Sequence, residues 1–519
     1  MKLDRFNNAK RNSIWGIINK IVLLVFPFIV RVFIIKKLGV EYLGLNGLFT
    51  SVLSILNLTE LGIGSAIVYS MYKPLAEEDT EKICSLMNLY KTLYRYIGML
   101  VLIVGLCIMP FINHLISGDV PTTINIYVLY LIYLLNAVIS YWLFAYKNCL
   151  LQVYQRTDIQ SKIILVLHSM MYILQIVILI IFHNYYIYII ILPLFSIIQN
   201  IVTALVVTHM YPQYSCNGII SKEEKNDIKK RVMGLMFTKI AAASRNSFDC
   251  IVVSALLGLN VVAIYSNYYY ISTSLSALLV ILVNSMSAGI GNSLVTESKQ
   301  KNINDINKIS FIYISISGFC FVLLLVLYQP FMKLWVGKEL LFSDSIMIYF
   351  SIYFLVEKSL NVVGQYYDAS GLWWKGKWKG LIESLANLVL NFVLCYFFGV
   401  KGIVFATIIT ILFIGFPLTS YYLYKYSLNI SSKDYVINEY KYMLFFIVSG
   451  LLIYLGCEKI IIDGLSIIIM MVLRAFISIV FMAILYLIVF SRTQIFKDSL
   501  DWMLIHLKLK KINKKGEML

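Results

Sequence analysis

The chain has 519 residues, of which 60% are hydrophobic and only 14% are charged, and its mean hydropathy is +0.81. Soluble proteins are about 45–50% apolar and about 25% charged, so this composition excludes an ordinary soluble protein. The formal net charge of +17 needs an anionic neighbour, either a nucleic acid or the headgroups of a membrane.

Motifs for catalysis and metal binding are missing from the sequence. The eight cysteines are scattered without a CxxC pair, so they indicate neither a disulfide framework nor a zinc site. Gly371–Trp378 has the spacing of a P-loop, but Trp378 occupies the position where Ser or Thr would hold Mg²⁺. We therefore expect no metal, no cofactor and no enzymatic activity.

Fourteen apolar stretches are long enough, at about 20 residues, to cross a bilayer as helices. In chain order they cover residues 14–35, 44–70, 94–115, 123–146, 163–182, 185–209, 235–257, 262–292, 309–329, 345–366, 379–398, 402–424, 443–462 and 466–490. The run 262–292 is too long for one straight span, and we expect Gly289 and Gly291 to end or bend it. The sequence thus predicts an all-α, polytopic membrane protein with 14 transmembrane helices.

The basic residues predict the orientation. With a cytoplasmic N-terminus, 34 of the 44 Lys and Arg residues fall in cytoplasmic segments and only six fall outside. This bias follows the positive-inside rule and predicts that both termini are cytoplasmic. The basic clusters Lys222–Arg231 and Lys508–Lys515 are then expected beside anionic lipid headgroups, and no nucleic-acid partner is needed. The first span exceeds the length of a signal-peptide core, so we expect it to be retained.

A weak internal repeat predicts the organisation of the spans. Leu38–Gly44 and Leu257–Ala263 share the pattern LGxxx[LV][GA] and precede the second and eighth spans. A six-span spacing indicates two parallel six-helix lobes. We predict an N-terminal lobe over 1–210, a C-terminal lobe over 211–425, and two added helices with a basic tail over 426–519.

Charged residues inside spans mark candidate sites, because each costs at least about 2.5–3.5 kcal/mol at mid-bilayer without a cavity or a partner. Arg245 and Asp249 are one turn apart on the seventh span. They form either a self-neutralising pair or a polar lumen in which Arg245 binds an anion. Arg31 either reaches the outer interface or faces the same cavity. Glu60, in the second span, either pairs with an arginine or carries a proton.

The remaining polar residues in spans are weaker candidates. Glu357 and Lys358 are adjacent, so we expect them on different faces and select only Glu357. Glu383 is expected at the cytoplasmic interface. Asn267 and Asn284 either bond between helices or line a cavity.

Several short segments together carry a family resemblance. They are Asn8–Ser13, Leu38–Phe49, Leu58–Gly64, Met71–Ala76, Asp249 in the seventh span, and Tyr265–Tyr268. With these segments the chain resembles bacterial polysaccharide flippases of the Wzx type, in the MOP exporter superfamily with the MATE drug exporters and the lipid II flippase. The resemblance covers nearly the whole chain and is strongest over 8–95 and 235–300.

The resemblance implies a MATE-like fold with two lobes around a cationic central cavity. Such proteins move an undecaprenyl-diphosphate-linked oligosaccharide from the cytoplasmic to the outer leaflet of the bacterial inner membrane by alternating access. The expected partners are this substrate, membrane lipid, polysaccharide polymerases and glycosyltransferases. The membrane potential, or coupling to H⁺ or Na⁺, would drive transport.

The resemblance also implies roles for individual residues of this chain. Substrate binding is assigned to Arg31, Arg245, Asn267 and Asn284, and ion coupling or pairing to Glu60, Asp249 and Glu357. Arg31 is the only arginine of the first span, which departs from a dense arginine set there.

Two other classes of membrane protein remain alternatives. A cation-coupled exporter of small drugs usually has twelve spans, and a polysaccharide polymerase or ligase usually carries a large external loop. The longest external segment predicted here is about 15 residues, around Pro330–Asp344.

Overall fold

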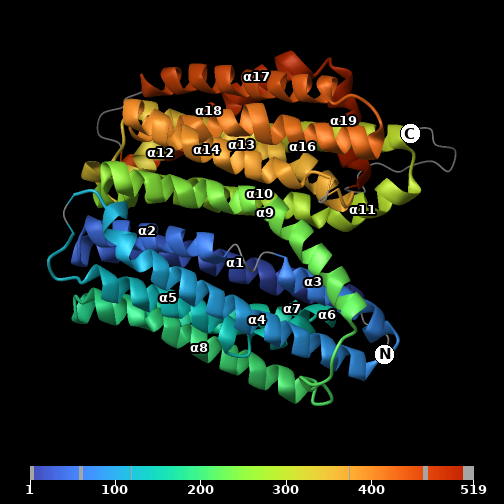
Figure 1. The fold of residues 1–519 in the computed structure, drawn as a ribbon. Coiled ribbons are helices and arrows are strands. Elements are labelled where there is room, and N and C mark those ends of the chain that lie inside the picture. The colour runs from blue at the N-terminus through green and yellow to red at the C-terminus, as the bar shows by residue number, and fades with distance from the viewer. Residues whose placement is uncertain (1–4, 58–61, 119, 373–374, 460–465, 507–519) are drawn as a thin grey trace. The chain divides into compact units, whose positions relative to one another are not determined.

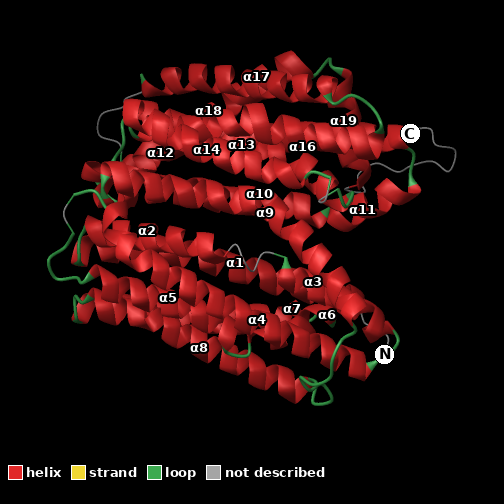
Figure 2. Ribbon diagram, in the orientation of Figure 1, coloured by secondary structure: helices red, strands yellow, loops and turns green. Residues whose placement is uncertain are grey.

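The computed structural model describes residues 5–57, 62–118, 120–372, 375–459 and 466–506, and all regular elements among them are helices (Figure 2). Contacts divide the chain into two compact units, Met1–Ser266 and Asn267–Leu519, called unit 1 and unit 2 below. The all-α fold is therefore confirmed, while the predicted boundaries near residues 210 and 425 stay a prediction.

Unit 1 is formed by eight complete helices, a long ninth helix and the start of a tenth (Figure 1). These are α1 (Arg5–Lys37), α2 (Val40–Leu56), α3 (Ile63–Ala76), α4 (Thr80–Ile108), α5 (Ile126–Trp142), α6 (Asn148–Val153), α7 (Thr157–Ile181), α8 (Tyr185–Met210), α9 (Lys222–Leu257) and α10 (Leu259–Ser285), with short 3₁₀ turns at Met109–Leu115 and Ala145–Lys147.

Unit 2 contains the rest of α10 and the helices that follow it. These are α11 (Ser287–Thr296), α12 (Lys299–Trp335), α13 (Asp344–Ala369), α14 (Lys377–Phe398), α15 (Val400–Thr410), the π-helix η5 (Ile411–Gly415), α16 (Phe416–Leu423), the π-helix η6 (Tyr424–Leu428), α17 (Lys433–Glu458), α18 (Ile467–Phe490) and α19 (Gln494–His506), with a 3₁₀ turn at Lys338–Leu340.

Helix lies at each of the fourteen stretches predicted to cross the membrane. Among the described residues, eleven helices are long and apolar enough to span a bilayer, or twelve if the bent pair α5 and α6 is one span. The other two stretches correspond to α2 with α3, and to α9, where the apolar helical segments are shorter. The number fourteen therefore stays a prediction. In the run 262–292 the expected break is misplaced, because the helix is interrupted at Met286 and Gly289 lies inside α11.

Polar side chains at helix starts explain where several helices begin. The Asn125 side chain accepts bonds from the first N–H groups of α5, and Asn184 does the same for α8. Ser221 and Ser466 cap α9 and α18. Each cap satisfies an amide that has no partner inside its helix.

Close side-chain packing, rather than the hydrophobic effect, holds transmembrane helices together, because lipid is as apolar as their side chains. In unit 1, Phe49 of α2 stacks obliquely on Tyr130 and Tyr133 of α5, at ring distances of 5.8 and 5.5 Å. In unit 2, α12 is the central helix and contacts α13, α17, α18 and α19. Its Gly318 lets Phe446 of α17 approach directly, since an added Cβ would lie 2.2 Å from that ring.

The two glycines of the predicted repeat have similar backbone conformations. Gly39 precedes α2 with φ of 132°, and Gly258 precedes α10 with φ of 88°. Both values belong to the region that only glycine enters readily. Each glycine therefore turns the chain sharply into the helix that follows it.

Gly44 of α2 lies at a close contact with the first residue of α10. A Cβ at Gly44 would lie 2.2 Å from the carbonyl oxygen of Leu259, whereas a Cβ at Gly16 of α1 would meet no atom within 4 Å. We predict that Gly44→Ala destabilises the protein by about 1–3 kcal/mol, because α2 and α10 must separate.

Gly16→Ala is the matched control and should leave stability unchanged or slightly raised. The thermal midpoints of both purified variants, measured in the same detergent, check the prediction. Equal midpoints for Gly44→Ala and the wild type would contradict the close packing of α2 on α10.

Candidate functional site

Arg31 and Asp249 both bond to the start of α10. Arg31, on α1, donates from Nη1 to the Ser266 hydroxyl at 3.2 Å. Tyr265 donates its hydroxyl to Oδ2 of Asp249, on α9, at 2.8 Å, and Asp249 is only 2% exposed. Three helices of unit 1 thus converge on one polar group, in which the predicted cation and the predicted acid contact neighbouring residues.

Two of the predicted residues fall outside this description. Arg245 lies on α9 one turn before Asp249, but its side chain is outside the described residues, and Glu60 lies outside them altogether. The anion-binding role of Arg245 and the proton-carrying role of Glu60 stay predictions.

Asn267 and Asn284 do not form one site. They lie on the same helix, α10, 17 residues apart, which corresponds to about 26 Å at 1.5 Å per residue. Asn267 is fully buried and Asn284 is exposed. The two amides therefore lie in different surroundings, and any shared role in substrate binding stays a prediction.

Glu357 and Lys358 form an ion pair, so the expectation that they point to different faces is wrong. The Lys358 ammonium bonds to the Glu357 carboxylate and donates to the Ser276 hydroxyl at 2.5 Å. The Lys358 side chain is completely buried and the Glu357 side chain is 26% exposed. The four-carbon stem of lysine is long enough to curl back to its neighbour, which helical spacing alone does not predict.

Glu383 is buried rather than interfacial. It is 3% exposed and lies against Gly415 of the π-helix η5. One turn further along α14, Asn387 donates from Nδ2 to Thr407 of α15 at 3.1 Å, and Asn391 donates to Asn387 Oδ1 at 3.3 Å. This polar belt joins α14 to α15, and π-helical segments such as η5 often accompany functional sites.

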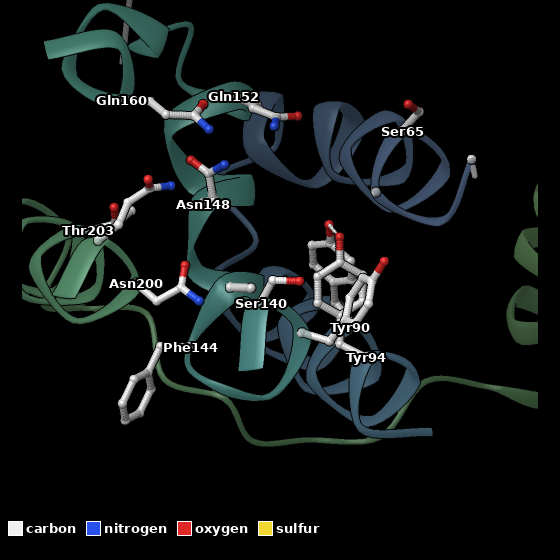
Figure 3. Close-up of a pocket in the computed structure, with 15 residues that line it drawn as sticks. Ser65, Tyr90, Tyr94, Ser140, Phe144, Asn148, Gln152, Gln160, Asn200 and Thr203 are labelled. Atoms are coloured by element: carbon white, nitrogen blue, oxygen red, sulfur yellow. Dashed lines mark hydrogen bonds between the residues drawn. The ribbon is translucent and has the colours of Figure 1, made fainter. Parts of the chain in front are cut away.

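Unit 1 contains a polar cavity of about 510 Å³ that is lined by residues of α3 to α8 (Figure 3). Five amide side chains line it: Asn148, Gln152, Gln160, Gln199 and Asn200. They come from α6, α7 and α8, three helices that the short loops of the chain bring together. We refer to this feature as the amide cavity.

A break between α5 and α6 builds one wall of the amide cavity. Phe144 has φ of 55°, a left-handed conformation that is strained for a bulky residue. The chain bends by 46° there before α6 begins. Asn148 and Gln152, four residues apart on α6, consequently face the cavity together (Figure 3).

Hydroxyl groups and aromatic rings complete the lining. Ser65, Ser140 and Thr203 contribute aliphatic hydroxyls. Tyr90 donates to the Tyr94 hydroxyl at 2.7 Å, with the rings 4.3 Å apart (Figure 3). The cavity therefore combines donors, acceptors and aromatic surface.

The described lining of the amide cavity contains no Asp, Glu, Lys, Arg or His. Several polar groups of this lining have no hydrogen-bond partner among the described residues. Oδ1 of Asn148 is buried without a hydrogen-bond partner among the described residues. Within the same part of the chain, the side chains of Gln160 and Asn200 form no hydrogen bond either. Such groups favour a polar occupant, because an unpaired polar group in apolar surroundings costs several kcal/mol.

Sequence reasoning missed this cavity because it followed charges. A usable signal was present, namely polar pairs at helical spacing within or beside spans: Tyr90 with Tyr94, Asn148 with Gln152, and Asn200 with Thr203.

The basic cluster at the start of α9 lines a separate hollow of about 470 Å³. Its lining combines Lys222, Lys225 and Lys229 with apolar residues such as Ile63 and Leu89. Lys82 of α4 also pairs with Glu224, and this lysine lowers the pKa of the Glu224 carboxyl. A surface that combines lysines with apolar side chains suits the anionic headgroup region of a membrane.

The described helices have the arrangement of the MOP transporter fold. The chain is similar to the lipid II flippase MurJ in its inward closed conformation, with a TM-score of 0.64 and 18% identity over 92% of this chain and 98% of that one. It is also similar to an inward-facing multidrug resistance MATE transporter of the MOP superfamily, with a TM-score of 0.55 and 14% identity over 83% of this chain and 96% of that one.

A third similar structure is a MOP superfamily transporter from Pyrococcus furiosus whose binding pocket has reversed polarity. Its TM-score is 0.52, with 14% identity over 82% of this chain and 96% of that one. No protein-family model and no curated protein sequence matches the chain. At these identities the likeness establishes the MOP fold.

The Glu357–Lys358 pair gives a test of the structure of unit 2. We predict that Lys358→Met lowers stability by roughly 3–5 kcal/mol, because it leaves the Glu357 carboxylate without its buried partner. The double variant Glu357→Gln with Lys358→Met should recover most of this loss. Reversible unfolding of the single and double variants measures the coupling. Additive effects of the two substitutions would contradict the pairing.

Proposed function

We propose that the chain is a flippase for undecaprenyl-diphosphate-linked oligosaccharide in the bacterial inner membrane. It would carry the saccharide headgroup from the cytoplasmic to the outer leaflet by alternating access, for the assembly of surface polysaccharide. The polymerases and glycosyltransferases of that assembly are its proposed partners. The MOP fold supports a transporter or flippase, and the amide cavity is the observation that carries the choice of substrate.

The physical problem of such a flippase is to hide hydroxyl groups from hydrocarbon. A saccharide has many hydroxyls, and each unpaired one costs several kcal/mol in a medium that cannot hydrogen-bond. The polyprenyl tail has the opposite requirement and is stable only in lipid. A cavity lined by amides and hydroxyls offers these hydroxyls hydrogen-bond partners, while the tail stays in the bilayer.

The diphosphate needs a cation along its path. Arginine binds phosphate oxygens through two parallel N–H donors, and we assign this role to Arg31 and Arg245. Asn267 and Asn284 remain proposed contacts on α10. An inside-negative membrane potential favours outward movement of an anion by about 2.3 kcal/mol per charge per 100 mV. Coupling to H⁺ or Na⁺ through Glu60, Asp249 or Glu357 is the alternative source of energy.

Two other functions make different demands on the protein. A drug exporter that takes organic cations would need acidic groups in its pocket, and the described lining of the amide cavity has none. A polymerase or ligase that uses a metal ion would need ligands for it, and no group of three or more His, Cys, Asp or Glu side chains that could hold a metal ion occurs among the described residues. Neither observation favours these functions, so they serve as outcomes of the test.

Proteoliposomes with a fluorescent undecaprenyl-diphosphate disaccharide test the proposal directly. A membrane-impermeant quencher reports the fraction of lipid in the outer leaflet. We predict rapid crossing with the wild-type chain and slow crossing in empty vesicles. Arg31→Gln should slow crossing about 10–100-fold, as expected for the loss of a charge-assisted contact.

Lys36→Gln is the matched control, since Lys36 is an exposed cation at the end of the same helix. With this variant the fluorescent lipid should cross at the wild-type rate. Crossing no faster than in empty vesicles would refute the flippase. Efflux of a fluorescent cationic drug, or lengthening of added saccharide chains, would point instead to the exporter or the polymerase.

A further inference from the structure

We infer that the amide cavity of unit 1 is a binding site for uncharged saccharide residues, so that the part of the headgroup it holds contains neutral hexoses or N-acetylhexosamines and no uronic or other acidic sugar. This inference rests on the proposed function and narrows its substrate class. It assigns the recognition to side chains of α6, α7 and α8.

The charge of the described lining disfavours the binding of acidic sugars. A carboxylate moved out of water without a counter-charge loses several kcal/mol even after the protein relaxes. The described lining offers no Lys, Arg or His to compensate that loss, and no Asp or Glu that would attract a cationic ligand. Such a site therefore binds a neutral polar molecule with the smallest desolvation cost.

The hydrogen-bonding groups match hydroxyls in kind. A sugar hydroxyl both donates and accepts, and an Asn or Gln amide presents an acceptor oxygen beside a donor NH₂ group. Asn148, Gln160 and Asn200 come from three different helices and face one cavity (Figure 3). Groups arranged around a space in this way contact several hydroxyls of one ring system at the same time.

Part of the hydrogen-bonding capacity of the lining is not used to join helices, although Gln199 does contact His168 of α7 at 2.9 Å. Asn148 Oδ1 is buried without a partner among the described residues, and Thr203, which lines the same cavity, is 9% exposed. Elsewhere in unit 1, amides of the same type do bond between helices: Asn136 accepts from Ser196 at 2.7 Å. The contrast points to an occupant of the cavity rather than to helix packing.

An aromatic wall and the size of the cavity fit a sugar ring. Tyr94 packs on both Tyr90 and Tyr141, at ring distances of 4.3 and 5.6 Å. Tyrosine combines an apolar ring with a polar tip, as a sugar combines C–H faces with hydroxyl edges. The volume of about 510 Å³ falls within the range of about 300–1,000 Å³ of small-ligand pockets, so the cavity holds part of a headgroup rather than a long chain.

The test uses the full chain in lipid nanodiscs and three probes: methyl glucoside, methyl N-acetylglucosaminide and methyl glucuronide. Saturation-transfer NMR titrations give a dissociation constant for each. We expect the two neutral glycosides to bind and the glucuronide to bind at least tenfold more weakly. This comparison needs no variant, so it stands even if a substitution impairs folding.

Two glutamines of α7 provide a matched pair of variants. Gln160 lines the amide cavity, whereas Gln175 lies deeper in the same helix and makes a 3.5 Å contact to the Tyr188 carbonyl. Gln160→Leu, and likewise Asn148→Leu, should weaken binding of the neutral glycosides about three- to tenfold, as expected for the loss of one or two hydrogen bonds. Gln175→Leu should leave binding unchanged.

Several results would overturn the inference. Binding of neutral glycosides no stronger than to empty nanodiscs would do so, as would equal binding of the glucuronide. Equal effects of Gln160→Leu and Gln175→Leu would assign any binding to another place. Failure here is distinct from failure of the proposed function: a chain that flips the lipid-linked disaccharide but binds no neutral glycoside loses only this inference, whereas a chain that binds glycosides but flips nothing loses the flippase.

Discussion

Hydrocarbon cannot hydrogen-bond, and this single constraint orders the whole molecule. Every polar group at membrane depth must find a partner in the protein or face a polar occupant. In unit 2, Lys358 is neutralised by Glu357, and Asn387 and Asn391 bond to each other within the belt between α14 and α15. In unit 1 the amide cavity meets it differently, because Asn148 and its neighbours point into a space instead of into another helix.

Building that space requires departures from regular helix. α5 and α6 meet at a 46° bend through a left-handed Phe144, and α2 and α3 are separate helices. A continuous helix would continue its apolar face along the bundle and leave no polar wall. The strain at Phe144 is the local cost of turning Asn148 and Gln152 inward.

The helical fold was predictable from the sequence because apolar length and charge distribution act over whole spans. The two glycines of the predicted repeat, Gly39 and Gly258, both have positive φ before a helix, and the repeat itself stays a prediction. The site was less predictable. Arg31 and Asp249 were predictable because they are charged residues inside spans, and they do bond to neighbouring residues of α10. The pairing of Lys358 with Glu357 depends on a flexible side chain, and the burial of Glu383 depends on the π-helical segment at Gly415. The amide cavity depends on how six helices pack, which no single stretch of sequence encodes.

The central claim is that a saccharide headgroup occupies the amide cavity, and photocrosslinking measures this most directly. An undecaprenyl-diphosphate saccharide with a diazirine on its sugar is reconstituted with the full chain, irradiated, and mapped by mass spectrometry. The account predicts crosslinks within 148–152 of α6 and 199–203 of α8, which excess unlabelled substrate abolishes. Crosslinks confined to other helices, or crosslinks that the unlabelled substrate does not reduce, would contradict it.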